Sequence, residues 1–288
     1  MYKFFAQKNS LIGWMLASPL SLVLVFFLIC PIIMIVIVSF WGATEFSIYP
    51  AFQWDNYEFL FSSPVTYSVF FKTFMYAFIT WVITLIIGFT IAYYLAFHIK
   101  SLTWQIALFL LCTIPFWTSN IIRMISWIPF LGRNGIANET LLGLGLISEP
   151  VEWLLFSDFA VILAFVHLYT LFMVVPIFNT MMRIDHSLLE AARDAGASGF
   201  QTLVNVIIPL CKPGIMIGSI FVVTLVMGDF ITVRFMSGSQ SANVGRLISN
   251  DVGLLQYPSA SATAVVLLLT VLITIGIMLR FVNIRKEL

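Results

Sequence analysis

Two charged side chains, Arg123 and Asp229, interrupt long apolar stretches of this 288-residue chain. A charge surrounded by so much apolar sequence is costly to bury and is by default a functional-site hypothesis. Three arrangements are open: an Arg123–Asp229 ion pair between two helices, Asp229 lining a cavity that attracts a cationic solute, or Arg123 extending alone to the membrane surface. Counted along unbroken helices at about 1.5 Å per residue, both charges would lie in the outer half of a membrane.

Polar and aromatic residues accompany the two charges. Ser119, Asn120, Ser126 and Trp127 share one side of the helix expected around Arg123, and this stripe is too polar to face lipid. Aromatic rings can bind an ammonium group by cation–π attraction, although ordinary packing remains the alternative for each ring. The candidates for a solute path are Asp229, Arg123, Asn120, Trp117, Tyr169 and Phe172.

The rest of the sequence does not predict an enzyme or a metal centre. Three cysteines lie far apart without partners at ligand spacing, so no zinc site is expected. Residues 226–229 lack the first glycine of a G-x-G-D motif, and no H-E-x-x-H occurs. There is no G-x-x-x-x-G-K-[ST] loop, so ATP and Mg²⁺ would be bound by a partner. We expect no cofactor in this chain, and His167 as a hydrogen-bonded packing residue.

The composition indicates that these residues lie in a membrane. The chain is 61% hydrophobic and 9% charged, with a mean hydropathy of +1.04, whereas soluble domains are roughly 45–50% apolar and about 25% charged. Its net charge of +1 gives no basic surplus for nucleic acid. About 20 apolar residues span a bilayer. The sequence predicts six such helices, at residues 12–40, 73–97, 105–128, 159–182, 213–236 and 259–281.

The distribution of basic residues predicts the orientation of these spans. Lysine and arginine concentrate in both terminal segments and in residues 183–212, whereas most acids fall in residues 41–72, 129–158 and 237–258. Because positive residues favour the cytoplasmic side, both termini are expected there. We therefore predict one all-α integral membrane domain over residues 1–288.

The segment at residues 183–212 is the least ordinary part of the chain. Ser187-x-x-Glu190 has the form of a capping box, and Gly196 is suited to a left-handed turn after the helix. Ser198-x-x-Gln201 repeats the capping form, and a second apolar run is expected to end at Pro209. The resulting helical hairpin either merely connects two spans or docks into a groove of a partner.

This segment resembles the EAA loop of ABC-importer permeases. Glu190-Ala191-Ala192-x3-Gly196-x9-Val206-x-Ile208-Pro209 follows the family pattern E-A-A-x3-G-x9-I-x-L-P, with two conservative departures. The resemblance implies the type I (MetI-like) permease fold with six transmembrane helices. It also implies a second permease subunit, two ATPase subunits that bind ATP and Mg²⁺, and a periplasmic solute-binding protein. The implied ATPase-coupling residues are Glu190, Ala191, Ala192, Arg193, Asp194, Gly196 and Pro209.

Finer features resemble one branch, the spermidine/putrescine permeases of the PotB/PotH type in the bacterial inner membrane. They are Pro115-Phe116-Trp117-Thr118 followed by Arg123, and Gly228-Asp229-Phe230. The branch implies import of a small cation, most simply a polyamine, and an opine or amino-acid-like solute is the alternative. An ion-coupled secondary transporter is a remote alternative, because ion coupling is expected to need several acidic residues inside the spans and this sequence has one.

Overall fold

The computed structural model describes residues 16–44 and 47–280. The chain divides into two compact units, Met1–Ser63 with Ile248–Leu268, and Pro64–Leu247 with Leu269–Leu288. Five helical runs in the described residues are long and apolar enough to cross a membrane, or six if one bent pair counts as a span. The predicted all-α integral membrane class is therefore confirmed, while a single domain over residues 1–288 stays a prediction.

The first unit begins with the described part of the first span. Its helix runs over Leu16–Val38 and contains a π-helical turn, η1 (Val25–Ile29), before α2 (Cys30–Val38); residues 12–15 of the predicted span lie outside the described residues. A short hairpin of β1 (Gly42–Ala43) and β2 (Ile48–Tyr49) follows, and then α3 (Asp55–Ser62). The Asn56 amide donates to the carbonyl of Trp41 at 2.9 Å and so ties α3 to the end of the span.

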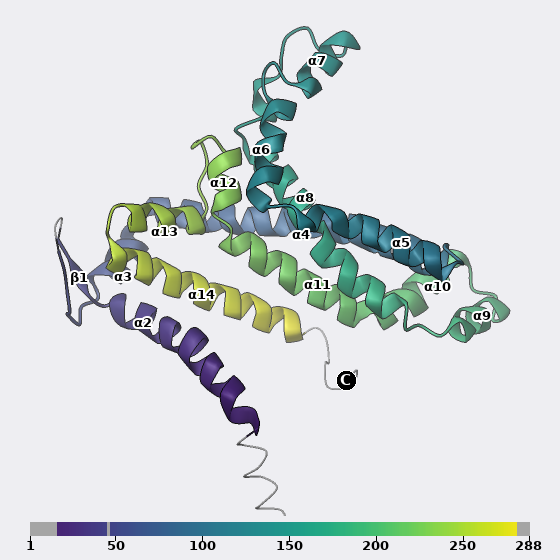
Figure 1. The fold of residues 1–288 in the computed structure, drawn as a ribbon, viewed down its shortest axis with the longest axis horizontal. Helices are drawn as coiled ribbons and strands as arrows, with labels where there is room; N and C mark the ends of the chain where they lie inside the picture. Colours follow the sequence, from purple (N-terminus) through teal and green to yellow (C-terminus); the bar gives the residue numbers. More distant parts are fainter. Residues whose placement is uncertain (1–15, 45–46, 281–288) are drawn as a thin grey trace, which may run out of the picture. The chain divides into compact units, whose positions relative to one another are not determined.

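The second unit holds most of the helices (Figure 1). In chain order they are α4 (Pro64–Phe97), α5 (Leu102–Thr113), η2 (Ile114–Trp117), α6 (Asn120–Leu131), α7 (Ile136–Gly143), η3 (Glu152–Leu154), α8 (Asp158–Met181), α9 (His186–Asp194), α10 (Gly199–Thr202), η4 (Leu203–Ile207), α11 (Ile208–Gly228) and α12 (Ile231–Met236). Two further helices, α13 (Val244–Gly253) and α14 (Tyr257–Arg280), each have residues in both units.

Helices α4, α8 and α11 lie side by side and form the core of the second unit (Figure 1). Tyr76, Phe165 and Val222 are fully buried among them. Gly214 and Gly218 of α11 allow a close approach to α8, since a Cβ on Gly214 would lie 2.5 Å from the Pro176 carbonyl oxygen. The Trp81 indole donates to Ser219 at 2.7 Å, which joins α4 to α11.

The second and third predicted spans need correction. The second helix begins at Pro64 rather than residue 73. Proline suits the first turn of a helix, because backbone N–H groups there have no partner within the helix and the missing N–H of proline costs no hydrogen bond. The third predicted span, residues 105–128, is not continuous. Thr118 is extended, and the helical segments on its two sides are bent by 88°.

The fifth span also differs from its prediction. It ends as α11 at Gly228, Asp229 is extended, and α12 begins at Ile231, so residues 213–236 form a broken helix. At its other end the helical run begins at Gly199 and continues through Pro209, which does not end it. The π-helical turn η4 ends at Ile207, two residues before Pro209. Such a wide turn accommodates a proline ring that would clash in regular α-helix.

Candidate functional site

The break in the fifth span places Asp229 between two helices. Its carboxylate accepts three hydrogen bonds: from the Tyr169 hydroxyl at 2.6 Å, the Thr232 hydroxyl at 2.6 Å and the Thr232 backbone N–H at 2.9 Å. The Thr232 bonds join the carboxylate to the first turn of α12, and the Tyr169 bond joins the break to α8. An ionised carboxylate has about four acceptor positions, so Asp229 retains capacity for one further donor.

Of the three predicted aromatic residues, Tyr169 contacts this carboxylate, Phe172 lies against the ring of Tyr169, and Trp117 has neither contact. The rings of Tyr169 and Phe172 are 6.2 Å apart, and Phe172 also contacts the ring of Phe116 at 5.6 Å. Trp117 is 83% exposed within this chain. The structure therefore groups Asp229, Tyr169 and Phe172, and leaves Trp117 outside the group.

Arg123 and Asp229 do not form an ion pair. The two ion pairs among the described residues are Lys72–Asp158 and Arg133–Glu152. Arg123 is buried and donates to the side-chain oxygen of Asn120, whereas its Nε has no hydrogen-bond partner. The prediction that both charges lie at the same membrane depth assumes unbroken helices. The bend before α6 breaks the helix that carries Arg123, so this prediction does not hold.

Arg123 faces a cavity of about 290 Å³ that His167 and Phe116 also line. His167 accepts a hydrogen bond from the Trp127 indole at 3.0 Å, so the expectation of a hydrogen-bonded packing histidine is confirmed. A buried guanidinium with an unused donor is expensive unless an anion compensates it. This cavity is therefore suited to a negatively charged group.

The predicted coupling loop forms a helical hairpin of α9 and α10 at one end of the bundle (Figure 1). Glu190, Ala191, Arg193 and Asp194 are exposed on α9, as are Gly196 and Pro209 after it, and Ala192 is half-buried. Leu189 packs inward, whereas Leu188 and Phe200 remain exposed, at 46% and 74%. An exposed carboxylate beside exposed apolar side chains is a surface that can dock into a groove.

The start of α9 differs from the prediction. Its N-cap is Asp185, whose carboxylate accepts from the Ser187 backbone N–H at 3.0 Å, and this bond lowers the pKa of Asp185. The expected capping box of Ser187 and Glu190 is not formed, because the helix begins before Ser187. The second capping box, Ser198 with Gln201, is present. Glu190 is therefore not used to cap its own helix.

We expect Gly196→Ala to destabilise the turn of the hairpin by about 1 kcal/mol. Gly196 has a φ of +81°, and a Cβ there would meet nothing within 4 Å, so the cost is backbone strain alone. Gly199→Ala is the matched control, since its Cβ also meets nothing and its φ is ordinary. Faster amide hydrogen exchange in residues 186–195 of the first variant alone is the expected result, and equal exchange in both would contradict it.

Lys72 and Asp158 are two further charges that hydropathy does not single out, because both lie at the edges of predicted loops. Lys72 lies within α4, and Asp158 in the first turn of α8 pairs with it at 3.5 Å. The available signals were Pro64 as a helix-starting proline, and Ser157 as an N-cap that accepts from the Ala160 N–H at 3.2 Å.

No group of three metal-binding side chains was found in the described ranges 16–44 and 47–280.

Comparison with known proteins identifies relatives over most of this chain. The family described as "Binding-protein-dependent transport system inner membrane component" matches residues 104–285. The spermidine/putrescine transport system permease protein PotB of Escherichia coli K12 is 34% identical over 275 residues, which cover 94% of this chain and 93% of that protein. PotC of the same system and strain is 32% identical over 104 residues, 36% of this chain and 39% of that protein.

Solved structures share the fold at low sequence identity. One chain of a bacterial ABC transporter for import of the acidic polysaccharide alginate has a TM-score of 0.74 and 19% identity, with 98% of this chain and 100% of that chain covered. The same score is found for a bacterial alginate ABC transporter in complex with its pentasaccharide-bound periplasmic protein, at 16% identity, with 96% of this chain and 95% of that chain covered.

Proposed function

Because this chain belongs to the family of inner-membrane components of binding-protein-dependent transport systems, we propose that it is the permease subunit of an ATP-driven polyamine importer. The chain would form part of the path through which a small organic cation crosses the membrane. Its similarity to PotB over 94% of its length supports a polyamine as the solute.

Asp229 is the residue that best supports a cationic solute. Its carboxylate lies between the C-terminal end of α11, where the helix dipole adds partial negative charge, and the N-terminal end of α12, where the dipole adds partial positive charge. Broken helices inside membranes commonly place such ends at the sites that bind ions. With one acceptor position left, Asp229 would receive a hydrogen bond from an ammonium group of the solute, beside the ring of Tyr169.

Arg123 supports a second candidate solute. Its Nε lacks a hydrogen-bond partner and the side chain lines the 290 Å³ cavity, so a carboxylate would compensate its charge. A zwitterion such as an opine or amino-acid-like compound has both an ammonium for Asp229 and a carboxylate for Arg123. A polyamine has no carboxylate, so an anion other than the solute would then have to compensate the charge of Arg123.

Transport would proceed by alternating access, with two permease subunits moving as rigid bodies. The partners would be a second permease subunit of PotC type, two ATPase subunits holding ATP and Mg²⁺, and a solute-binding protein. Both termini and the α9–α10 hairpin would be cytoplasmic, in agreement with the basic residues there. Glu190, together with exposed Leu188 and Phe200, would contact the ATPase.

The test is ATPase activity of the complete importer reconstituted in proteoliposomes with its binding protein. We expect spermidine or putrescine to stimulate hydrolysis several-fold, while opines and amino acids leave it at the basal rate. Stimulation by a zwitterion alone would contradict the polyamine assignment and favour the second candidate. No stimulation by any of these solutes would contradict both.

A further inference from the structure

A buried segment, residues 241–246, contacts the break in the fifth span. The Asn243 amide donates to the backbone carbonyl of Asp229 at 2.6 Å and is only 1% exposed. Its side-chain oxygen accepts from the Arg246 backbone N–H at 3.0 Å, which fixes the orientation of the amide. A Cβ on Gly245 would lie 3.3 Å from the Gly228 carbonyl oxygen, so this segment packs directly against the break.

The same segment is anchored to α4 at two points. The Val244 backbone N–H donates to the Thr73 hydroxyl at 3.0 Å, and the Lys72 ammonium donates to the Ser241 hydroxyl at 2.8 Å. Thr73 and Val244 are at most 1% exposed. Residues 241–246 therefore connect α4 to Asp229 through hydrogen bonds at both ends.

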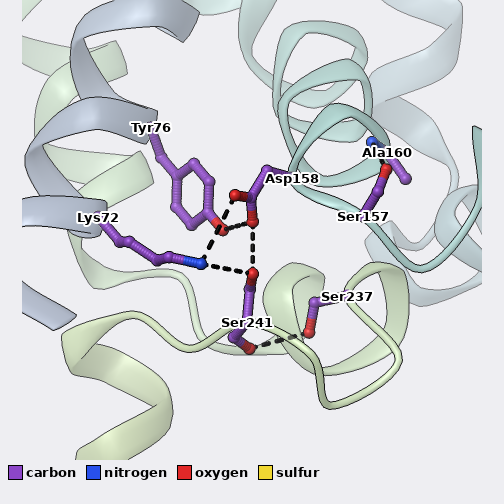
Figure 2. A network of polar contacts seen from close by, with 7 residues as sticks. All are labelled: Lys72, Tyr76, Ser157, Asp158, Ala160, Ser237 and Ser241. Atoms are coloured by element: carbon purple, nitrogen blue, oxygen red, sulfur yellow. Dashed lines mark hydrogen bonds and ion pairs between the residues drawn. The ribbon is translucent and has the colours of Figure 1, made fainter. Parts of the chain in front are cut away.

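The anchor between Lys72 and Ser241 belongs to an ionic cluster formed by Lys72, Tyr76, Asp158 and Ser241 (Figure 2). The Asp158 carboxylate lies 3.5 Å from the Lys72 ammonium and accepts from the Tyr76 hydroxyl at 2.5 Å. It also accepts from Ser241, whose own carbonyl accepts from Ser237 at 3.0 Å. The side chains of Lys72 and Asp158 are 32% and 39% exposed, and their opposite charges join three segments at this half-buried position.

We propose that this cluster and Asn243 are positioning residues for Asp229. Lys72 and Asp158 hold Ser241, the segment 241–246 transmits that position, and Asn243 holds the Asp229 carbonyl. Asp229 sits in extended backbone between two helices, so these contacts hold the backbone that carries its carboxylate, while Tyr169 and Thr232 hold the carboxylate itself. The inference rests on the proposed function, in which Asp229 binds the ammonium group of the solute.

The first measurement is uptake of labelled spermidine by the reconstituted importer. Lys72→Met and Asn243→Ala should each raise the half-saturating concentration roughly three- to tenfold, the range that one lost hydrogen bond allows. Arg133→Met is the matched control, because its ion pair with Glu152 is exposed and distant in sequence from the break. Combined with Asp229→Asn, Lys72→Met and Asn243→Ala should add no further effect. Additive effects would overturn the inference.

The second measurement reports the break without using a solute. Gly228 is exposed and a Cβ there meets nothing within 4 Å, so Gly228→Cys can carry a maleimide label once the native cysteines are replaced. Lys72→Met and Asn243→Ala should change the labelling rate at least about threefold. Lys72→Arg, which keeps the cation, should restore it. If Lys72→Met lowers the amount of protein in the membrane, Ser241→Ala takes its place.

The two measurements separate failure of the inference from failure of the proposed function. Unchanged labelling in both Lys72→Met and Asn243→Ala would overturn the positioning role, whatever Asp229→Asn does to uptake. Changed labelling combined with normal uptake by Asp229→Asn would overturn the role of Asp229 in solute binding and leave the positioning of the break intact.

Discussion

Replacing Glu190 with alanine is expected to lower spermidine uptake by at least about 30-fold in the reconstituted importer. The Glu190 carboxylate is exposed on α9, and the cap of that helix is Asp185. Loss of this carboxylate should therefore change the stability of the hairpin little. We expect it to weaken docking of the ATPase instead. Truncating one member of a buried, hydrogen-bonded charge pair at an interface costs about 2–5 kcal/mol, and we expect docking to bury Glu190 in such a pair. Uptake and solute-stimulated hydrolysis measured together would show whether the subunits separate or hydrolysis continues without transport.

The matched control for this prediction is Glu139→Ala. Glu139 is also an exposed glutamate in a short helix, α7, which lies in a segment predicted to face the other side of the membrane. Uptake by this control should equal that of the parent chain. Normal uptake by Glu190→Ala, at equal abundance in the membrane, would refute the coupling role.

Asp229→Asn is expected to raise the half-saturating concentration for spermidine about 10- to 100-fold. A hydrogen bond to a charged group contributes about 1.5–3 kcal/mol, which corresponds to this range. Asparagine retains an acceptor for the Thr232 N–H, so this contact with the first turn of α12 is kept. The substitution removes the charge of Asp229, and in place of Oδ2 it presents an amide NH2 group from which the Tyr169 and Thr232 hydroxyls can accept.

The control for the loss of charge is Asp55→Asn, since Asp55 is an exposed aspartate in the first turn of α3. Its uptake should be unchanged. Asp229→Glu should recover part of the affinity, because the charge is retained at a slightly different position. If Asp229→Asn lowers only the amount of folded protein, with unchanged affinity per molecule, Asp229 is a structural cap and not a solute ligand.

The membrane class, the spans and the hairpin could be predicted from the sequence because each depends on local pattern. Apolar stretches of bilayer length indicate spans whatever packs beside them, and α8 and α14 lie within two residues of their predicted bounds. The turn at Gly196 and the capping box at Ser198 were also predictable, since both are made by residues close in sequence. The EAA pattern lies in this same local segment.

The helix ends that were wrong involve backbone features that hydropathy does not register. Residues 213–236 are apolar enough for one continuous span, yet the chain breaks at Asp229, where Thr232, Tyr169 and Asn243 satisfy the polar groups of the break. The two prolines differ: Pro209 lies within a helical run that the sequence predicts to end there, whereas Pro64 correctly signals a helix start that hydropathy places later.

By itself, the sequence determined that this protein is a multi-span membrane chain, that its segment at residues 183–212 carries an EAA-like pattern, and that Arg123 and Asp229 are its unusual charges. Only the tertiary structure decided that these charges do not pair, that Asp229 lies at a helix break beside Tyr169, and that Lys72 pairs with Asp158 and contacts Ser241. The physical reason is distance along the chain. Contacts such as Lys72 with Ser241 depend on how whole helices pack, which no local pattern of residues encodes.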